Sequence, residues 1–284
     1  MAPEWIEQIR RDNRSGAAEL ARQAALALAE WAPGRAPDEI AAALRALLAA
    51  QPRMAPMLHL AAAVLAKPGD AAAACREFLA RLDAAAEAVA ERAAVLIEEG
   101  DVVATHSRSS SVLSALRKAR IRGKRFCVYL TESRPMAEGV TLARELAAAG
   151  IPVRLFVDAA LGQIVSEARV VLVGADAVTP DGVINKIGTW PLALAARERA
   201  VPVYALATTD KFVPDDHELP AELPRDAAEV LASPPAGVEI ANYYFEATPL
   251  DLFQALVTED GLMAPECVRA RLHALRLPAE LRGG

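Results

Sequence analysis

DVVATHSRSSSVLSALRKARIRGKRFCVYLTESRP, residues 101–135, is the stretch that decides the fold. Two short apolar runs, 101–105 and 126–131, enclose a segment at 110–119 that is predicted to be helical. A strand, a helix and a second strand in this order are typical of a parallel sheet that is covered by helices.

The same alternation continues toward the C-terminus. Further strands are predicted at 153–157, 170–174 and 203–207, and further helices at 136–149, 159–166 and 191–200. The sequence therefore predicts an α/β fold in which residues 101–284 form a doubly wound, Rossmann-like domain with a parallel sheet. Its first strand is not followed by the glycine-rich dinucleotide fingerprint, so we do not expect NAD.

Residues 1–100 have a different character. Prolines and glycines divide them into segments that all read as helix, with no strand pattern between them. Asp70 stands where it can cap the last of these helices. We expect an all-helical N-terminal domain over 1–100.

Composition and charge exclude several classes of protein. The net charge of −6 and the lack of a lysine and arginine stripe argue against a nucleic-acid partner. The three cysteines are too few and too scattered for a disulfide framework or a zinc site, so we expect no metal, no cofactor and a reducing compartment. No stretch has the length and hydropathy of a membrane span, and we expect a cytoplasmic protein with no membrane partner.

Polar side chains follow each predicted strand. In open α/β sheets ligands bind beyond the carboxyl ends of the strands, so these loops are expected to meet at one edge. They bring together hydroxyls, cations and carboxylates, in the order THSRSSS (105–111), TESR (131–134), Asp158, GAD (174–176) and TTDK (208–211).

Four candidates stand out in these loops. Arg108 and Ser109 lie in the serine-rich first loop, which suits an anion at the start of a helix, although ordinary capping would explain one of the serines. Arg134 offers a further cation after the second strand. Asp176 ends an apolar run, where desolvation can prepare a carboxyl group for acid–base chemistry. His106 is a secondary candidate, since a lone histidine is more often a packed residue than a catalyst.

The motifs THSRSS, YLTESRP, VDAALG, VGADAV, NKIGT and DKFVP resemble those of one family. Its members are the alpha, beta and delta subunits of eukaryotic translation initiation factor 2B, methylthioribose-1-phosphate isomerase and ribose-1,5-bisphosphate isomerase. RRDNRSGAAEL near the N-terminus and AQPRMAPMLHL near Gln51 fit the same pattern, so the resemblance covers essentially the whole chain.

The resemblance implies roles for particular residues. The phosphate-holding segment of the isomerases corresponds to Arg14, Gly16 and Ala17, with Ser15 interposed. The catalytic aspartate corresponds to Asp176, and an asparagine–lysine pair that contacts substrate corresponds to Asn185 and Lys186. A substrate-contacting glutamine corresponds approximately to Glu138, and a family arginine falls at Gln51 or Arg53.

Ser107 is the main departure from the isomerases, which carry a catalytic cysteine after threonine and histidine. A serine hydroxyl is a much poorer proton donor or acceptor than a thiol. The sequence therefore favours a factor 2B alpha-like protein that binds a sugar phosphate or nucleoside phosphate with weak or no catalysis. An active aldose–ketose isomerase and a subunit of a larger complex stay open as alternatives, and a homodimer or higher homo-oligomer is expected.

Overall fold

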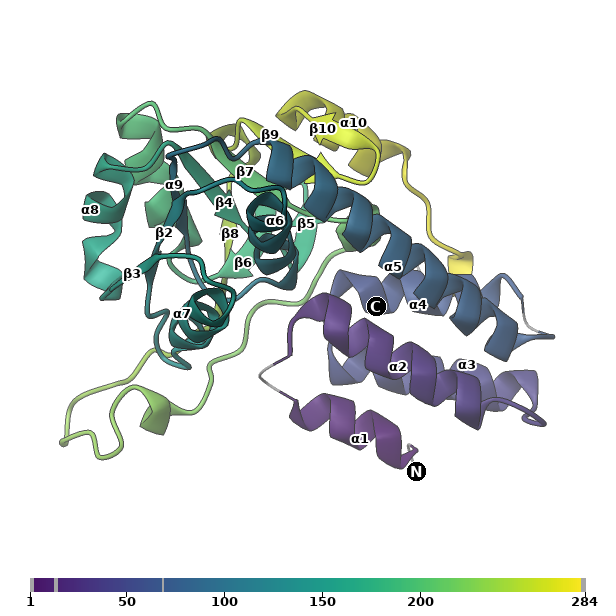
Figure 1. Ribbon diagram of the computed structural model, residues 1–284. Helices are drawn as coiled ribbons and strands as arrows, with labels where there is room; N and C mark the ends of the chain where they lie inside the picture. The colour runs from purple at the N-terminus through teal and green to yellow at the C-terminus, as the bar shows by residue number, and fades with distance from the viewer. Residues whose placement is uncertain (1–2, 13–14, 68, 282–284) are drawn as a thin grey trace.

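The structure is a computed structural model that describes residues 3–12, 15–67 and 69–281 (Figure 1). Its N-terminal part is helical, as predicted from the sequence. The side chain of Asp70 caps the long last helix by accepting a hydrogen bond of 2.8 Å from the amide of Ala73. The helices of this part are α1 Glu4–Arg11, α2 Ala17–Trp31, α3 Pro37–Ala50, α4 Ala55–Leu65 and α5 Ala71–Val95.

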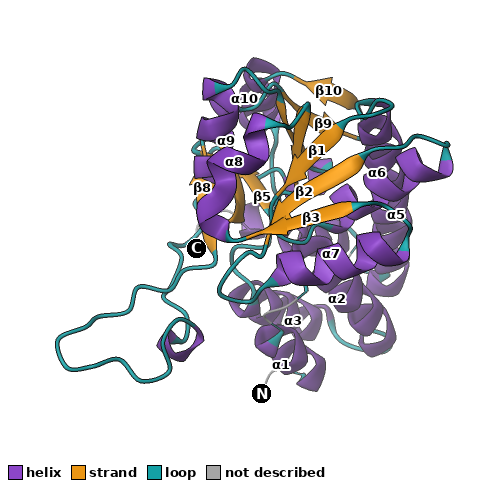
Figure 2. Cartoon of the chain, turned by 60° about the vertical axis from the view of Figure 1, so that its left-hand side comes forward, coloured by secondary structure: helices purple, strands orange, loops and turns teal. Residues whose placement is uncertain are grey.

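A mostly parallel sheet forms the centre of the C-terminal part (Figure 2). Its order is β10-β9-β7-β4-β1-β2-β3, and only β10 runs antiparallel to its neighbour. The parallel strands follow the 3-2-1-4-5-6 order of Rossmann sheets, with β7 and β9 in the last two places, which confirms the predicted fold. The strands are β1 Val102–Thr105, β2 Cys127–Thr131, β3 Val153–Phe156, β4 Val170–Val173, β7 Val203–Leu206, β9 Ala255–Thr258 and β10 Gly261–Met263.

Helices cover both faces of this sheet (Figure 2). The second half of α5 packs on one face together with α6 (Ser110–Ile121) and α7 (Glu138–Ala148). The opposite face is covered by α8 (Leu161–Ser166), α9 (Thr189–Glu198) and α10 (Pro265–Ala274). Successive side chains of a strand point to opposite faces, so neighbours such as Leu172 and Val173 enter different cores.

A small antiparallel sheet was missed in the sequence. It has the order β5-β6-β8 and consists of β5 Ala177–Thr179, β6 Gly182–Lys186 and β8 Phe245–Thr248. Ala177 and Ile184 of this sheet are buried in the same hydrophobic cluster as the N-terminal helices. The small sheet therefore joins the helical part to the edge of the large sheet.

The segment after α10 packs on the protein, whereas the segment before β8 extends away from it. Leu277 and Leu281, after α10, are buried in the hydrophobic core of the N-terminal helices. The segment between Val213 and Tyr244 instead makes a long excursion with little regular structure (Figure 1).

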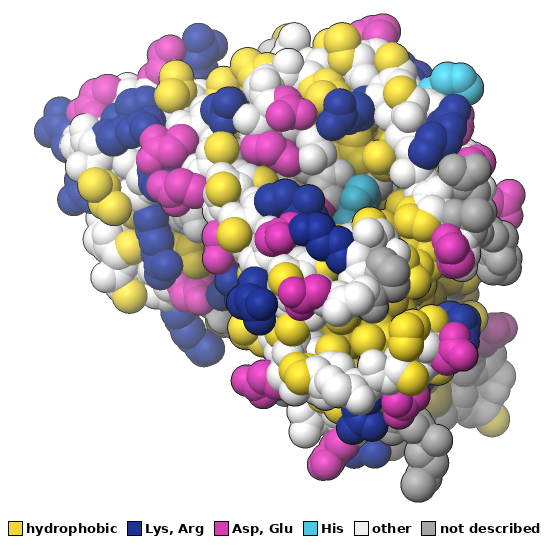
Figure 3. Space-filling model, turned by 90° about the vertical axis from the view of Figure 1, so that its right-hand side faces the viewer, with side chains coloured by type: hydrophobic (Ala, Val, Ile, Leu, Met, Phe, Trp, Pro, Cys, Tyr) yellow, Lys and Arg dark blue, Asp and Glu magenta, His cyan; other side chains and the backbone are white. Residues whose placement is uncertain are grey.

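On the face seen in Figure 3, basic and acidic side chains are interspersed. None of the described helices combines the length and the hydropathy of a membrane span.

Candidate functional site

A cavity of about 360 Å³ lies at the carboxyl ends of β1 and β4, between the sheet and the start of α2. These two strands are the point at which the strand order of the sheet reverses, which is where α/β sheets bind ligands. The walls come from the start of α2, the serine-rich loop after β1, the start of α7, the end of β4, and strands β6 and β8. The side chains and backbone that line it belong to residues 15–19, 107–110, 138, 174–176, 185–186, 211 and 244–245.

The serine-rich loop is held tightly against the sheet. Ser107 is 8% exposed, has a φ of 63°, and donates its backbone N–H to the hydroxyl of Ser133 at 2.8 Å. Ser109 caps α6 through a hydrogen bond of 3.4 Å from the amide of Val112. A Cβ on Gly174 would lie 2.6 Å from the Ser109 hydroxyl, so the glycine is what lets the loop lie over the end of β4.

Helices α2 and α6 both begin at this cavity. Gly16 precedes the first turn of α2, and the amide of Ala17 points at Asp176, with 3.4 Å between the nitrogen and Oδ1. Unpaired N–H groups and the helix dipole make such helix starts favourable for anions. Two of them converge here on one cavity.

Asp176 is a partly buried carboxyl group in the wall of the cavity. Burial raises its pKa above the ordinary value. Three positive neighbours oppose this effect in decreasing order, namely the Lys211 ammonium, the Ala17 amide and the Lys186 ammonium, while Glu138 adds to it. A carboxyl group in such surroundings can change its protonation state closer to neutral pH than an exposed one, as a general acid or base must.

Lys186 is buried and forms an ion pair with Glu138, with 2.6 Å between Nζ and Oε1. Its Nζ also lies 4.6 Å from the centroid of the Tyr244 ring. The other carboxylate oxygen of Glu138 is buried without a hydrogen-bond partner in the described part of the chain. The cavity wall therefore offers a hydrogen-bond acceptor that a ligand hydroxyl can satisfy.

Asn185 is also buried, on the strand that carries Lys186. Its amide nitrogen donates to the hydroxyl of Thr189 at 2.9 Å, and that hydroxyl donates to the Lys186 carbonyl at 2.6 Å. The Thr189 hydroxyl thus fixes the amide group of Asn185 at the cavity. Asn185 and Lys186, the predicted pair, are consecutive residues of β6, and both line the cavity.

Lys211 was not among the predicted site residues. It is 5% exposed, lies in a short 3-10 helix, η2 (Thr209–Lys211), and lines the same cavity as Asp176, where its charge acts to lower the pKa of that carboxyl group. Within the described residues its ammonium has no hydrogen-bond or ion-pair partner, so it is available to an anion. Lys211 follows the predicted strand at 203–207, and the loops after the other predicted strands supplied the candidate residues. The same reasoning could therefore have identified Lys211.

Tyr244 is the second residue that sequence reasoning did not place. Its ring forms a wall of the cavity, and its hydroxyl donates to Glu229 at 2.6 Å. Burial, together with the Glu229 carboxylate, raises its pKa, so the phenol stays protonated. Three consecutive aromatic residues, 243–245, thus have different surroundings, since Tyr243 is exposed while Tyr244 and Phe245 line the cavity.

His106 is a structural residue in this arrangement. One ring nitrogen lies 2.7 Å from the carbonyl of Ile187, which can only accept, and the other lies 2.6 Å from the hydroxyl of Thr131. Burial lowers its pKa and keeps the ring neutral. Gly188 is needed beside it, because a Cβ there would lie 2.6 Å from the imidazole.

The predicted arginines are placed differently from one another. Arg108 lines the cavity, where Glu145 holds its guanidinium through two hydrogen bonds of 2.8 and 2.9 Å. Arg134 donates to the carbonyl of Glu229 at 2.9 Å and is not among the described residues that line the cavity. Arg14 lies outside the described residues.

The two candidates for the family arginine, Gln51 and Arg53, lie in different surroundings. Gln51 donates to the carbonyls of Ile9 and Asp12 and so caps the end of α1. Arg53 instead pairs with Glu222 at 3.1 Å, in an adjoining hollow beside Tyr244. Neither side chain reaches into the cavity itself.

The curated proteins that the chain resembles include some named as isomerases and some named as translation initiation factor subunits. It is 43% identical over 169 residues to the ribose 1,5-bisphosphate isomerase of Archaeoglobus fulgidus, a match covering 58% of this chain and 54% of that protein. It is equally identical over 165 residues to a putative translation initiation factor eIF-2B subunit 2-like protein of Pyrococcus horikoshii, covering 57% of this chain and 58% of that one. The chain thus spans little more than half the length of the curated relatives it matches.

Solved structures agree with these matches. The P. horikoshii translation initiation factor eIF-2B superposes with a TM-score of 0.82 at 36% identity, covering 92% of this chain and 96% of that one. The 5-methylthioribose 1-phosphate isomerase of the same organism shares the fold, with a TM-score of 0.73 at 23% identity over 94% of this chain and 86% of that one. The model of the initiation factor 2 subunit family matches residues 13–265. This confirms the resemblance inferred from the motifs, and the chain belongs to the initiation factor 2 subunit family.

Proposed function

We propose that the cavity binds a phosphorylated pentose and interconverts its aldose and ketose forms. The observation that carries this proposal is Asp176, a carboxyl group whose pKa is raised by burial and which lines the same cavity as the buried ammonium of Lys211. The named activity of the A. fulgidus relative supports the same class of substrate. The reading in which the protein only binds its ligand comes second.

The cavity offers separate groups for the two ends of such a substrate. The starts of α2 and α6 and the ammonium of Lys211 suit the phosphate, because all present positive charge or unpaired N–H groups. Glu138 and Asn185 suit the sugar hydroxyls, since each places polar atoms at the cavity wall. A sugar phosphate satisfies both sets, whereas inorganic phosphate satisfies only the first.

Aldose and ketose differ in which of the first two carbons carries the carbonyl oxygen. Isomerisation therefore moves the hydrogen on C2 to C1, while one substrate oxygen gains a proton and the C2 hydroxyl loses one, so it needs groups that give and remove these protons. Asp176 is proposed as the group that exchanges protons with the substrate. Ser107 lies in the same wall and is proposed to hydrogen-bond the reacting oxygens, because its hydroxyl is a weak acid and a weak base.

Binding without turnover is the second candidate function. The specific observation that favours it is Ser107 itself, a hydroxyl where the motif resemblance implies a catalytic thiol. The hydroxyl can still hydrogen-bond a sugar. A protein of this kind would recognise the phosphopentose through the same walls and release it unchanged.

One experiment separates the two functions. Ribose 1,5-bisphosphate and 5-methylthioribose 1-phosphate are each incubated with the natural protein and with the Asp176→Asn variant, ketose formation is followed by NMR, and binding is measured by calorimetry. Turnover by the natural protein that the variant lacks, with binding retained, supports the isomerase. Binding without turnover supports the second candidate, and the absence of both contradicts the phosphopentose site.

We also propose that the protein associates with itself through α9. Trp190 and Leu194 are 43% and 39% exposed and lie four residues apart, so they share one face of this helix. Ile187, just before the helix, is exposed as well. Exposed large apolar side chains that gather on one face are typical of a contact between proteins.

A reducing compartment fits the chemistry of the chain. Cys75, Cys127 and Cys267 are all free. Free cysteines are typical of reducing compartments, so we propose a cytoplasmic location. We also propose that the chain divides near residue 100 into a helical domain and a sheet domain.

A further inference from the structure

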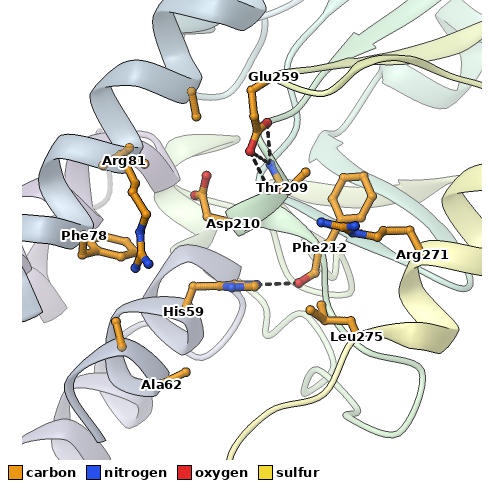
Figure 4. A pocket seen from close by; sticks show the side chains of 13 residues that line it. His59, Ala62, Phe78, Arg81, Thr209, Asp210, Phe212, Glu259, Arg271 and Leu275 are labelled. Carbon is orange, nitrogen blue, oxygen red and sulfur yellow. Dashed lines mark hydrogen bonds between the residues drawn. The ribbon is translucent and has the colours of Figure 1, made fainter. Parts of the chain in front are cut away.

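A second cavity, of about 430 Å³, also borders η2, at Thr209 and Asp210 (Figure 4). The two cavities share no lining residue. This second cavity is formed where α4 and α5 meet η2, the turn after β9 and helix α10. It is therefore built from both the helical part and the sheet part of the chain.

Some polar groups in this cavity already have partners. Both carboxylate oxygens of Glu259 accept from the backbone amide of Thr209, at 3.0 and 3.1 Å. The Nε2 atom of His59 lies 2.8 Å from the carbonyl of Phe212. These contacts hold η2 and its flanks in place, so they fix the direction of the side chain between them, Asp210.

Three charged groups in the cavity are left without such contacts. Oδ2 of Asp210 is buried and has no hydrogen-bond partner in the described part of the chain. Arg81 makes no hydrogen bond or ion pair with the described residues, and Arg271 only approaches the exposed Asp260 at 3.8 Å, a contact of little strength. Figure 4 shows the two arginines reaching toward the cavity from opposite walls, with Asp210 between them.

The remaining wall is apolar. Phe78 and Leu82 of α5 face Leu275 at the end of α10 across the cavity. A ligand that fits must therefore combine an anionic group for the arginines, a hydrogen-bond donor for the buried carboxylate oxygen, and an apolar body. A buried carboxylate oxygen favours a charged donor, because a charge-assisted hydrogen bond offsets its desolvation best.

We propose that this cavity binds a small zwitterion of the amino-acid type, with its carboxylate at Arg81, its ammonium at Asp210 and an apolar side chain against Phe78 and Leu275. The site is distinct from the phosphopentose site, since it uses none of the same groups. A plain anion would leave Asp210 unsatisfied and add a negative charge beside it. A plain amine would make no use of the two arginines, which are exposed to solvent at the cavity.

Calorimetry on the full chain tests this proposal with L-leucine, L-methionine and L-phenylalanine as probes. Matched analogues are 4-methyl-2-oxopentanoate, which is leucine without the ammonium, and 3-methylbutylamine, which is leucine without the carboxylate. At least one amino acid is expected to give saturable binding, and each analogue of leucine is expected to bind about tenfold or more weakly than leucine. The absence of saturable binding by all three amino acids at millimolar concentration would overturn the proposal.

Variants locate the site. Asp210→Asn and Arg81→Gln are each expected to weaken binding of the best probe by about tenfold or more, because each removes one charged partner. Arg76→Gln is the matched control, since Arg76 is exposed on the same helix as Arg81 but does not line the cavity. Circular dichroism and thermal melting check that each variant is folded. Binding that is unchanged in both of the first two folded variants, or lost equally in the control, contradicts the proposed site.

Discussion

Glu138 neutralises Lys186 inside the candidate site, with 2.6 Å between the carboxylate oxygen and the ammonium nitrogen. The lysine side chain is only 4% exposed, so solvent screens this pair weakly. Lys186 therefore offers less positive potential to a phosphate than its place in the cavity suggests. Lys211, which has no such partner among the described residues, is left as the principal buried cation of the site.

Glu138→Gln is expected to strengthen phosphate binding. The amide keeps a hydrogen bond to Lys186 but removes a negative charge from the wall, so the affinity for inorganic phosphate should rise several-fold, with a steeper dependence on salt. Calorimetry at two ionic strengths measures both effects. The control is Glu77→Gln, which removes the carboxylate of an exposed pair with Lys67 far from the cavity. Weaker phosphate binding in the Glu138 variant would contradict this account of the wall.

Asp176→Asn is expected to stabilise the protein near neutral pH. Burial raises the pKa of Asp176 in the folded state, so the folded state holds this proton over a pH range in which the unfolded chain has lost it. The natural protein loses stability as pH rises from the pKa of Asp176 in the unfolded chain, near 4, through its higher pKa in the folded protein. The asparagine variant carries no such proton and does not lose this stability. The variant should therefore be more stable by about 1–2 kcal/mol at pH 8.

Denaturant unfolding at pH 4 and pH 8 checks this expectation. The difference between the two proteins should be small at the lower pH and larger at the higher. Asp216→Asn is a suitable control, because Asp216 is exposed in the long excursion after η2. A difference that does not depend on pH would mean that packing, and not the titration of Asp176, causes the effect.

Five of the seven strands of the large sheet could be predicted because their signals are local, whereas β9 and β10 were missed. Runs such as 170–174 are short and apolar, and all but the run 203–207 are followed by a predicted helix. The same signals placed Asp176, Ser107 and Ser109 at one edge, where the structure brings them together. Parallel strands end at the same side of a sheet, so order along the chain was enough to gather the loops.

The small sheet could not be predicted in the same way. Lys186 of β6 pairs with Phe245 of β8, across a long excursion that carries no pattern of its own. Such pairing depends on tertiary contacts and not on local propensity. For this reason Asn185 and Lys186 were assigned to the site only through the motif resemblance, and nothing in the sequence indicated that Tyr244 would lie against Lys186.

Trp190→Glu is expected to separate self-associated protein into monomers. The substitution places a charge on the exposed apolar face of α9, and a buried unpaired charge at an interface costs several kcal/mol. Mass photometry or light scattering across a range of concentrations measures the change. Leu262→Glu provides the control, because Leu262 is also exposed but lies on the edge strand β10. A natural protein that is monomeric at high concentration would refute association through α9.

The second cavity is expected to influence the first through η2. Asp210 faces the second cavity and Lys211, the next residue, faces the first, so a ligand that holds Asp210 also restrains Lys211. A zwitterion that binds the second cavity should therefore change the affinity for inorganic phosphate, and by linkage phosphate should change the affinity for the zwitterion by the same factor. Calorimetric titrations of each ligand with and without the other measure both factors. Equal affinities in both titrations would show that the cavities act independently.

Ser107→Cys tests whether the cavity is an isomerase site that lacks only a thiol. Ser107 lies in the wall with Asp176, Asn185 and Lys186, so a cysteine there would place an ionisable group beside the same substrate atoms. A thiol exchanges protons near neutral pH far more readily than a serine hydroxyl, and we expect ketose formation to increase by tenfold or more. Asp176→Asn in the Ser107→Cys background should remove the gain, because the carboxyl group that works together with the thiol is then lost. Ser110→Cys is the matched control, since it adds a thiol to the same loop at the start of α6. A gain of similar size in that control, or a gain that survives the loss of Asp176, would contradict a shared role for Ser107 and Asp176.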